Sequence, residues 1–557
     1  MYTLKRNFKF LFLKNEYLYT NCFMQTQHIP LQETGRFSQL ICDYLSQKKD
    51  LQDFYSQYPD LENFQEAMDR KRVHFSKDTR SVLTDVLQEQ YAAVEMTKAV
   101  SNNLELLVKE NTFTITTGHQ LCLMTGPLYF IYKIVSTINL CKQLKTRYPK
   151  SNFVPVYWMA SEDHDFEEVS SFQFQDKKIK WNREAAGAVG ALPLDDLQAV
   201  LDTFETHLGK QPEAAVVKAW LDQSYRNAAD LSEATFRLVH KLFGASGLLV
   251  LEPNVKALKN LFSPCMKEEL DTQSSNESVL FQIEQIKAKY DVNYRPQVNP
   301  RPINLFYLTP KGRFRIEKEE DYFVLQGTEQ RFTKSEFFAL LETHPERFSP
   351  NVILRPLYQE VILPNICYIG GGGEIAYWFQ LKHNFDRLQV PFPLLLVRNS
   401  VLLYANKLGK KINKLGLEPS DLFLNRKALI DKKVREISEI DLELNFLKEQ
   451  LEKQFAYLQT LVTKTDKSFK GAVEAQQKKQ VKGVEHLEKR LLKAQKRMLT
   501  DQVQRLELLH DTLFPKDQLQ ERSQNFISFY LEIGSDFIPG LLDALDPLNP
   551  DFTLIEY

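Results

Sequence analysis

Two short runs of polar and ionisable residues could carry out chemistry in this chain. Gly118-His119-Gln120 follows the β-branched run Phe113–Thr117, and Glu162-Asp163-His164-Asp165 follows the apolar run Val154–Ala160. Carboxylates can recognise the ammonium group of an amine-bearing substrate, and a nearby histidine is available as a base. We therefore predict a site in which the catalytic residues are His119, His164 and Asp163 and the substrate-binding residues include Gln120, Glu162 and Asp165.

Each run also has a plainer interpretation. His119 could be a core histidine bonded to a carbonyl group, and the four residues from Glu162 could form a solvated loop whose aspartate caps a helix. His and Asp could also bind Mg²⁺ or Zn²⁺, but adjacent residues rarely all reach one ion. We therefore assign no metal site.

The elements around these runs form a strand–helix–strand unit. Phe113–Thr117 and Val154–Ala160 have the length and composition of buried strands. Between them, Thr125-Gly126-Pro127 predicts a helix start, because proline at the first helical position loses no needed N–H, and apolar residues recur at helical spacing up to Tyr148. The two strands should be parallel. Both polar runs should then face one crevice at the carboxyl edge of the sheet.

A similar strand–loop–helix–strand pattern recurs later in the chain. Val361–Ile369 is predicted as a strand, Gly370–Gly373 as a loop, Glu374–Phe385 as a helix and Pro391–Val397 as a further strand. Glycines let a backbone approach a ligand closely, and a helix N-terminus offers free N–H groups to an anion. We assign nucleotide or anion binding to Thr117, Gly118, Gly126, Gly370, Gly371, Gly372 and Gly373.

Two arginines lie beside this second half of the sheet. Arg355 and Arg398 could bind substrate carboxylates through the bidentate guanidinium fork, although a structural ion pair is the alternative for each. Asn351 and Glu374 are further substrate-binding candidates close to them in the sequence.

Composition restricts the class of protein. The 557 residues carry a net charge of −1, which gives no indication of nucleic-acid binding, and no apolar run approaches the roughly 18 residues that span a bilayer. Six scattered cysteines without a CxxC pair predict a reducing, cytoplasmic location. In residues 1–23 the longest apolar stretch, Phe10–Leu13, is too short for a signal peptide, so we interpret this segment as a dispensable extension.

The expected fold is α/β, with a Rossmann-like parallel-sheet core, connecting insertions and a long antiparallel coiled coil. The coiled coil is predicted because apolar residues step by threes and fours on both sides of a break at Thr463–Gly471. A hairpin of this length predicts a homodimer. The expected segments are 1–23 (extension), 24–169 (first half of the core with N-terminal helices), 170–345 (core continuation with β-rich and helical insertions), 346–425 (second half with the glycine-rich loop), 426–513 (coiled coil) and 514–557 (a C-terminal segment that packs on the core).

Several motifs resemble those of one family, the cysteine-adding enzymes of bacillithiol biosynthesis. They are Thr117-Gly118-His119-Gln120, Thr125–Tyr129, Trp158–Asp165, Ser349–Pro356 and Gly373–Trp378, in this order, and the coiled coil lies where the family has one. The resemblance covers 24–557. It implies a Rossmann-like core, a dimerising coiled coil and a ligase that adds cysteine to glucosaminyl-malate in the last step to bacillithiol.

Amide formation between an amine and a carboxylate in water requires activation of the carboxyl group. ATP with Mg²⁺ is expected on these chemical grounds alone, and the sequence itself identifies no cofactor. Two alternatives stay open: a nucleotidyl transferase or adenylate-forming enzyme on another substrate, and a metabolite-binding scaffold that acts through its coiled coil. The expected partners are cysteine, glucosaminyl-malate and a second copy of the chain, with no nucleic acid and no membrane.

Overall fold

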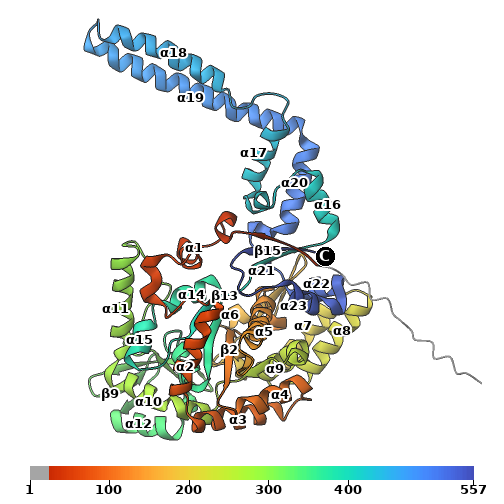
Figure 1. Ribbon diagram of the computed structural model, residues 1–557, viewed down its shortest axis with the longest axis vertical. Helices are drawn as coiled ribbons and strands as arrows, with labels where there is room; N and C mark the ends of the chain where they lie inside the picture. The colour runs from red at the N-terminus through yellow and green to blue at the C-terminus, as the bar shows by residue number, and fades with distance from the viewer. Residues whose placement is uncertain (1–23) are drawn as a thin grey trace, which may run out of the picture.

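The centre of the molecule is a five-stranded parallel sheet. The structure, a computed structural model, describes residues 24–557, so the predicted extension lies outside the described residues. The strand order is β13-β12-β2-β3-β6, and every neighbouring pair is parallel. The strands are β2 (Thr112–His119), β3 (Asn152–Met159), β6 (Leu249–Leu251), β12 (Asn365–Gly370) and β13 (Leu394–Val397). The predicted Rossmann-like core is confirmed, with helices on both sides of the sheet (Figure 1).

The predicted strand–helix–strand unit consists of β2, α5 (Tyr129–Arg147) and β3. β2 pairs with β3 in parallel from Thr112 opposite Asn152 to His119 opposite Met159. The helix begins two residues later than predicted. Its entry is a tight turn in which the amide of Phe130 donates to the carbonyl of Pro127 and that of Ile131 donates to Leu128, three residues back instead of four.

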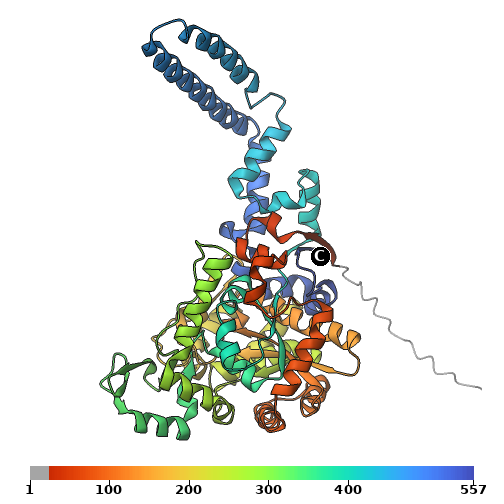
Figure 2. The same ribbon diagram turned by 60° about the vertical axis from the view of Figure 1, so that its left-hand side comes forward.

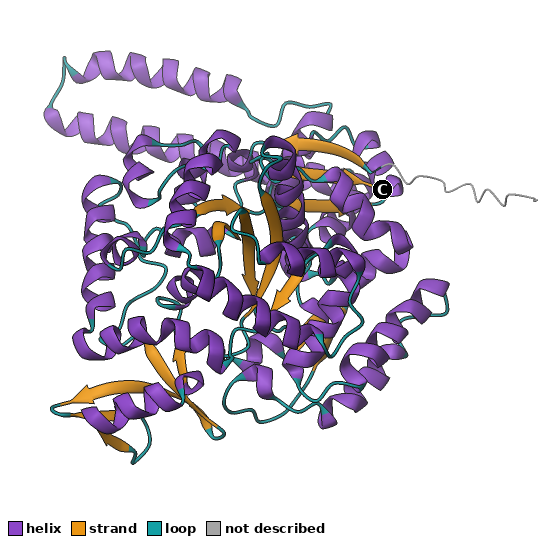
Figure 3. Ribbon diagram, turned by 60° about the horizontal axis from the view of Figure 1, so that its bottom comes forward, coloured by secondary structure: helices purple, strands orange, loops and turns teal. Residues whose placement is uncertain are grey.

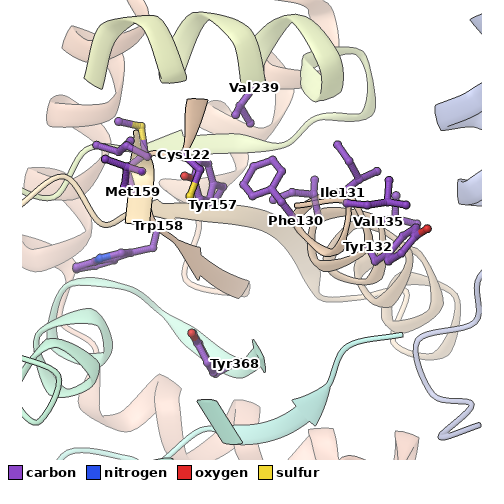
Figure 4. Packing of buried hydrophobic residues seen from close by; sticks show 14 of the residues in the cluster. Cys122, Phe130, Ile131, Tyr132, Val135, Tyr157, Trp158, Met159, Val239 and Tyr368 are labelled. Atoms are coloured by element: carbon purple, nitrogen blue, oxygen red, sulfur yellow. The ribbon is translucent and has the colours of Figure 1, made fainter. Parts of the chain in front are cut away.

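Buried side chains from several elements meet around β3 (Figure 4). Tyr157 and Met159 of β3 lie on the same side of the sheet as Phe130 of α5 and Val239 of α9 (Leu231–Phe243), whereas Trp158 points to the opposite side. All of them are less than 2% exposed. Their burial removes a large apolar area from water, which is the main term that stabilises the core.

The chain between β3 and β12 contains two kinds of insertion. Helices α7 (Gln198–Glu205), α8 (Pro212–Leu221), α9, α10 (Lys256–Thr272) and α11 (Ser274–Lys289) come first. A five-stranded antiparallel sheet follows, set apart from the central sheet (Figure 3). Its strands are β7 (Leu305–Thr309), β8 (Gly312–Glu319), β9 (Tyr322–Leu325), β10 (Arg331–Thr333) and β11 (Phe348–Pro350), and α12 (Lys334–Thr343) packs against it.

The segment 173–201 is more regular than its Ala- and Gly-rich composition suggests. β4 (Ser171–Phe174) and β5 (Lys177–Lys180) form an antiparallel hairpin. Phe172 and Phe174 both pack edge-on against Phe204 of α7. These aromatic contacts with a later helix fix the hairpin.

In the second half of the core, the observed strand β12 starts and ends later than the predicted strand Val361–Ile369. Val361 lies in the last turn of helix α13 (Arg355–Ile362), and β12 begins only after Pro364. Gly370 belongs to β12, whereas Gly372 already lies in α14 (Gly372–Trp378), so the expected four-glycine loop is reduced to Gly371. The expected helix Glu374–Phe385 is divided into α14 and α15 (Lys382–Arg387).

A helical arm projects from the core (Figures 1 and 2). It contains α17 (Arg426–Ile437), α18 (Asn445–Val462), α19 (Lys467–Met498) and α20 (Thr500–Leu513), with α18 paired to α19 and α17 paired to α20. The predicted antiparallel coiled coil is confirmed, but a loop at 438–444 interrupts its first run. That loop ends at Leu444, which has a φ of 42° and therefore cannot continue a right-handed helix.

The two ends of the described chain meet in a small sheet. β15 (Phe552–Glu556) lies between β1 (Gln25–Ile29) and β14 (Val401–Tyr404), antiparallel to β1 and parallel to β14. Before it, α21 (Gln520–Ser523), α22 (Phe526–Ile533) and α23 (Phe537–Ala544) follow the arm, and α23 packs against α5. Among the described residues, no helix combines the length and apolarity needed to cross a membrane.

Candidate active site

Two pockets lie side by side at the carboxyl ends of β2, β3 and β12, and share Trp158, Ala160 and Arg355. We call the first the arginine chamber; its volume is about 380 Å³ and its lining includes Glu162, Asp163, Asn299, Arg301, Phe306, Arg313, Asn351 and Arg355. We call the second the histidine chamber; its volume is about 290 Å³ and it is lined by Gly118, His119, Gln120, Tyr129, Lys133, Trp158, Ala160, Arg355, Tyr368, Glu374 and Tyr377.

His119 is the last residue of β2 and not part of an open loop. It is 9% exposed, because the rings of Tyr129 and Phe130 lie 5.4 and 5.2 Å from its own. Its Nε2 has no hydrogen-bond partner among the described residues. Burial, reinforced by the nearby Lys133 cation, lowers the pKa of His119 to about 3. The imidazole is therefore neutral at neutral pH.

An ion pair between the buried Lys133 and the partly exposed Glu374 forms the floor of the histidine chamber. The ammonium of Lys133 donates to the carbonyl of Gly118 at 2.7 Å and lies 2.6 Å from Oε1 of Glu374. The other oxygen of Glu374 accepts from the hydroxyl of Tyr368 at 2.7 Å. Burial lowers the pKa of Lys133, and although burial alone would raise the pKa of Glu374, the Lys133 cation outweighs it and lowers that pKa.

The glycine-rich turn beside this floor is already hydrogen-bonded within the protein. The N–H of Gly371 donates to Glu374 Oε1 at 3.1 Å. Gly372 packs against Ile41, whose Cγ1 would lie 3.1 Å from an added Cβ. A carboxylate thus occupies the position where a phosphate was expected. This geometry disfavours anion binding by Gly370–Gly373.

Thr117 and Gly126 have structural contacts as well. The hydroxyl of Thr117 donates to the carbonyl of Ile369 across the sheet at 2.8 Å. Gly126 has a φ of 67°, and an added Cβ would lie 2.6 Å from that of Cys122. Of the residues predicted to bind a nucleotide, Gly118 alone lines a chamber.

The predicted proximity of the two polar runs is confirmed. Gln120, directly after β2, donates through Nε2 to Oδ2 of Asp163, beyond β3, at 3.0 Å. Asp163 also lies 3.4 Å from a guanidinium nitrogen of Arg313. Burial alone would raise the pKa of Asp163, but hydrogen bonds from His164 and Gln120 and the charge of Arg313 outweigh it, so the pKa lies below its usual range.

Glu162 is likewise compensated by a cation. It is buried and forms an ion pair with Lys259 of α10. Lys259 is fully buried and also donates to the carbonyl of Phe348 at 2.8 Å. Two of the three carboxylates predicted in this run, Glu162 and Asp163, are therefore already paired with basic side chains of the insertions.

The other two residues of this run lie outside both chambers. His164 is exposed, with Nδ1 3.5 Å from Asp163 Oδ1 and 3.3 Å from Arg313. Asp165 caps α6 (Phe166–Val169), where its carboxylate accepts from the amide of Glu168 at 3.4 Å. For Asp165 the structure agrees with the plainer interpretation of a helix cap.

Arg355 and Arg398 have different environments. Arg355 lines both chambers and donates to Gln359 Oε1 at 3.0 Å and to the hydroxyl of Tyr377 at 3.4 Å. No carboxylate of the described residues lies within 4 Å of its guanidinium. Arg398 lines neither chamber and instead forms a bidentate pair with the buried Glu521, at 2.7 and 3.0 Å, which is the alternative of a structural ion pair.

Asn351 lines the arginine chamber, but both ends of its amide are engaged. Its Nδ2 donates to Asn304 at 2.9 Å, and its Oδ1 accepts from the amide of Ile353 at 2.8 Å. Its first role is to shape the turn that leads into α13, the helix that begins with Arg355.

Sequence reasoning missed several chamber residues, above all Lys133, Arg301 and Arg313. Lys133 had a detectable signal, because it is the only charged residue in the otherwise uncharged stretch from 128 to 141. Arg301 precedes strand β7, and Arg313 is the second residue of β8. No local sequence pattern marks either of them as a site residue. Within residues 24–557, no group of three or more His, Cys, Asp or Glu side chains is arranged to hold a metal ion.

A parallel Rossmann-like sheet with a charged pocket at the carboxyl ends of its strands defines an α/β protein that binds small polar ligands there. Two family models match the chain: "Bacillithiol biosynthesis BshC, N-terminal Rossmann-like domain" over 24–399, and "Bacillithiol biosynthesis BshC, C-terminal coiled-coil domain" over 401–557. The chain therefore belongs to the BshC family of bacillithiol biosynthesis.

Several similar proteins carry the name "Putative cysteine ligase BshC". One from Flavobacterium johnsoniae is 49% identical over 96% of this chain and 100% of its own length. One from Christiangramia forsetii is 47% identical over 96% and 99%, and one from Cytophaga hutchinsonii is 36% identical over 94% and 97%. The similarity extends over both the core and the helical arm.

Proposed function

We propose that this protein is a cysteine ligase of bacillithiol biosynthesis, which joins the carboxyl group of cysteine to the amine of glucosaminyl-malate. Membership of the family and the names of its relatives support the reaction class. The position of Arg355 is the observation that carries the proposal. A cation without a carboxylate partner, at the junction of two chambers, suits the carboxyl group that must react.

The charge of the arginine chamber supports a dianionic substrate in it. Three arginines (Arg301, Arg313 and Arg355) line this chamber with only two carboxylates, and each carboxylate already pairs with a cation. The uncompensated charge is positive. A malyl group, with two carboxylates that guanidinium groups bind bidentately, fits this balance better than an ammonium group does.

The residues that we propose for catalysis line the two chambers. His119 lies in the wall of the histidine chamber, and Gln120, which follows it, donates to Asp163 in the wall of the arginine chamber. Activation of the carboxyl group would require a phosphate donor such as ATP with Mg²⁺, on chemical grounds. Lys133 and Arg355 are the cations nearest to where such a phosphate would act.

Metabolite analysis tests the proposed function. Cells that lack the protein should accumulate glucosaminyl-malate and lose bacillithiol, and the wild-type gene should restore both levels. An Arg355→Gln gene should fail to restore them although the variant accumulates to wild-type amounts. Unchanged levels of both metabolites in the deletion strain would contradict the proposal.

We further propose that the protein is a homodimer through its helical arm. Large apolar side chains on the arm are exposed in the single chain, including Phe446 (67%), Tyr457 (65%) and Leu487 (54%). A second copy would cover such side chains. Deletion of 428–513, closed with a short linker, should convert a dimer into a monomer in light scattering. A deletion variant that still elutes as a dimer would place the interface on the core.

A further inference from the structure

We propose that the histidine chamber is the cysteine subsite and that the arginine chamber holds the amine-bearing co-substrate. The inference rests on the proposed function and divides that site into two parts. The first argument is size: the histidine chamber has a volume of about 290 Å³, and the arginine chamber about 380 Å³. Cysteine is the smaller substrate, and it would be largely enclosed in the smaller space.

The polar groups of the histidine chamber match an amino-acid zwitterion. Arg355 has no carboxylate partner within 4 Å among residues 24–557, so its fork is available for the α-carboxylate. Glu374 provides the acceptor for the α-ammonium. A carboxylate accepts about four hydrogen bonds, and Glu374 uses Oε1 for Lys133 and Gly371 but Oε2 for Tyr368 alone. One acceptor position on Oε2 remains.

The lining of the same chamber suits the side-chain thiol. Nε2 of His119 is buried and has no hydrogen-bond partner in the described part of the chain, which is an unusual condition for a buried polar atom. The rings of Tyr129, Trp158, Tyr368 and Tyr377 line the chamber around it. Aromatic side chains make favourable contacts with polarisable sulfur, so this lining suits a thiol better than a charged side chain.

The arrangement also presents the reacting end of cysteine to its co-substrate. Arg355 belongs to the shared wall, together with Trp158 and Ala160. A carboxyl group bound by Arg355 therefore lies at the boundary of the arginine chamber. The amine of the co-substrate then approaches the carboxyl carbon of cysteine from the arginine chamber. The thiol and the ammonium group of cysteine lie on the side of the histidine chamber that faces away from it.

Binding of small probes to the wild-type protein tests the subsite without any mutation. In isothermal titration calorimetry under reducing conditions, L-cysteine should bind at least tenfold more tightly than each of three probes that lack one group. These are 3-mercaptopropionate without the ammonium, cysteamine without the carboxylate, and L-alanine without the thiol. Equal affinity for cysteine and all three probes would overturn the assignment.

Two variants of the full-length protein locate the subsite. Glu374→Gln should weaken cysteine binding at least tenfold and remove the preference for cysteine over 3-mercaptopropionate. Arg301→Gln, in the arginine chamber only, should leave cysteine binding within twofold of wild type. If Arg301→Gln weakens cysteine binding and Glu374→Gln does not, cysteine occupies the arginine chamber. That result overturns the inference and leaves the ligase function intact. If the wild-type protein forms no amide product from cysteine, the proposed function itself fails.

Discussion

Replacing Glu521 by alanine is expected to lower the free energy of unfolding by about 3–5 kcal/mol, because it leaves a buried guanidinium without its counter-charge. Glu521 is 0% exposed and its partner Arg398 is 5% exposed. Glu521 also accepts from the backbone amide of Val401 at 3.0 Å, so that amide loses its partner as well. Denaturation by urea, followed by circular dichroism, measures the change.

Two control variants show whether the loss comes from the uncompensated charge. The double variant Arg398→Met with Glu521→Leu removes both charges and should recover a large part of the lost stability. Glu110→Ala breaks an exposed pair with Lys77 and should leave the transition nearly unchanged. A Glu521→Ala protein as stable as wild type would mean that water reaches Arg398 in place of the carboxylate.

Substitution of His119 by alanine is expected to lower kcat by about 100-fold, because His119 lines the chamber proposed to hold cysteine and its loss would shift the carboxyl group of cysteine out of its reacting position. Asp163→Asn should instead raise KM for the amine-bearing substrate, because Asp163 holds both Arg313 and Gln120 in place. Since Gln120 connects the two residues, the double variant should lose less activity than the product of the two single losses. Steady-state kinetics of the four proteins give the comparison.

The matched control for this series is Glu167→Gln, which alters an exposed carboxylate on the neighbouring helix α6. It should keep wild-type kinetics. Thermal unfolding must show that the His119 and Asp163 variants stay folded, since His119 is buried against Tyr129 and Phe130. Folded variants with normal kinetics would contradict the catalytic assignment and move attention to the arginines.

The part of the site that could be predicted from sequence depends on local elements. Gln120 and Asp163 each follow a strand of one strand–helix–strand unit, and parallel pairing alone places both at one edge. Arg398 could not be assigned in this way. Its partner Glu521 lies more than 100 residues further along the chain, beyond the whole arm, and nothing near Arg398 indicates that its charge is compensated.

The glycine-rich turn shows a second limit of sequence reasoning. Four consecutive glycines indicate an open loop, but β12 extends into Gly370 and α14 begins at Gly372. The capping carboxylate of Glu374 then takes the amide that an anion would have used. Helix capping and anion binding require the same backbone groups, so the pattern alone does not distinguish them.

The small sheet at the chain ends has a consequence for synthesis on the ribosome. β15 lies between β1 and β14, and β1 has no other partner strand among residues 24–557, so within this part of the chain it stays unpaired until residues 552–556 have been made. At about 5–20 residues per second, the nascent chain carries an unpaired β1 for roughly 25–105 s. The central sheet, complete at Val397, can form during this time. Residues 552–556 then pair with both β1 and β14. A nascent chain that stops just before them would leave the edges of these two strands exposed to chaperones and proteases.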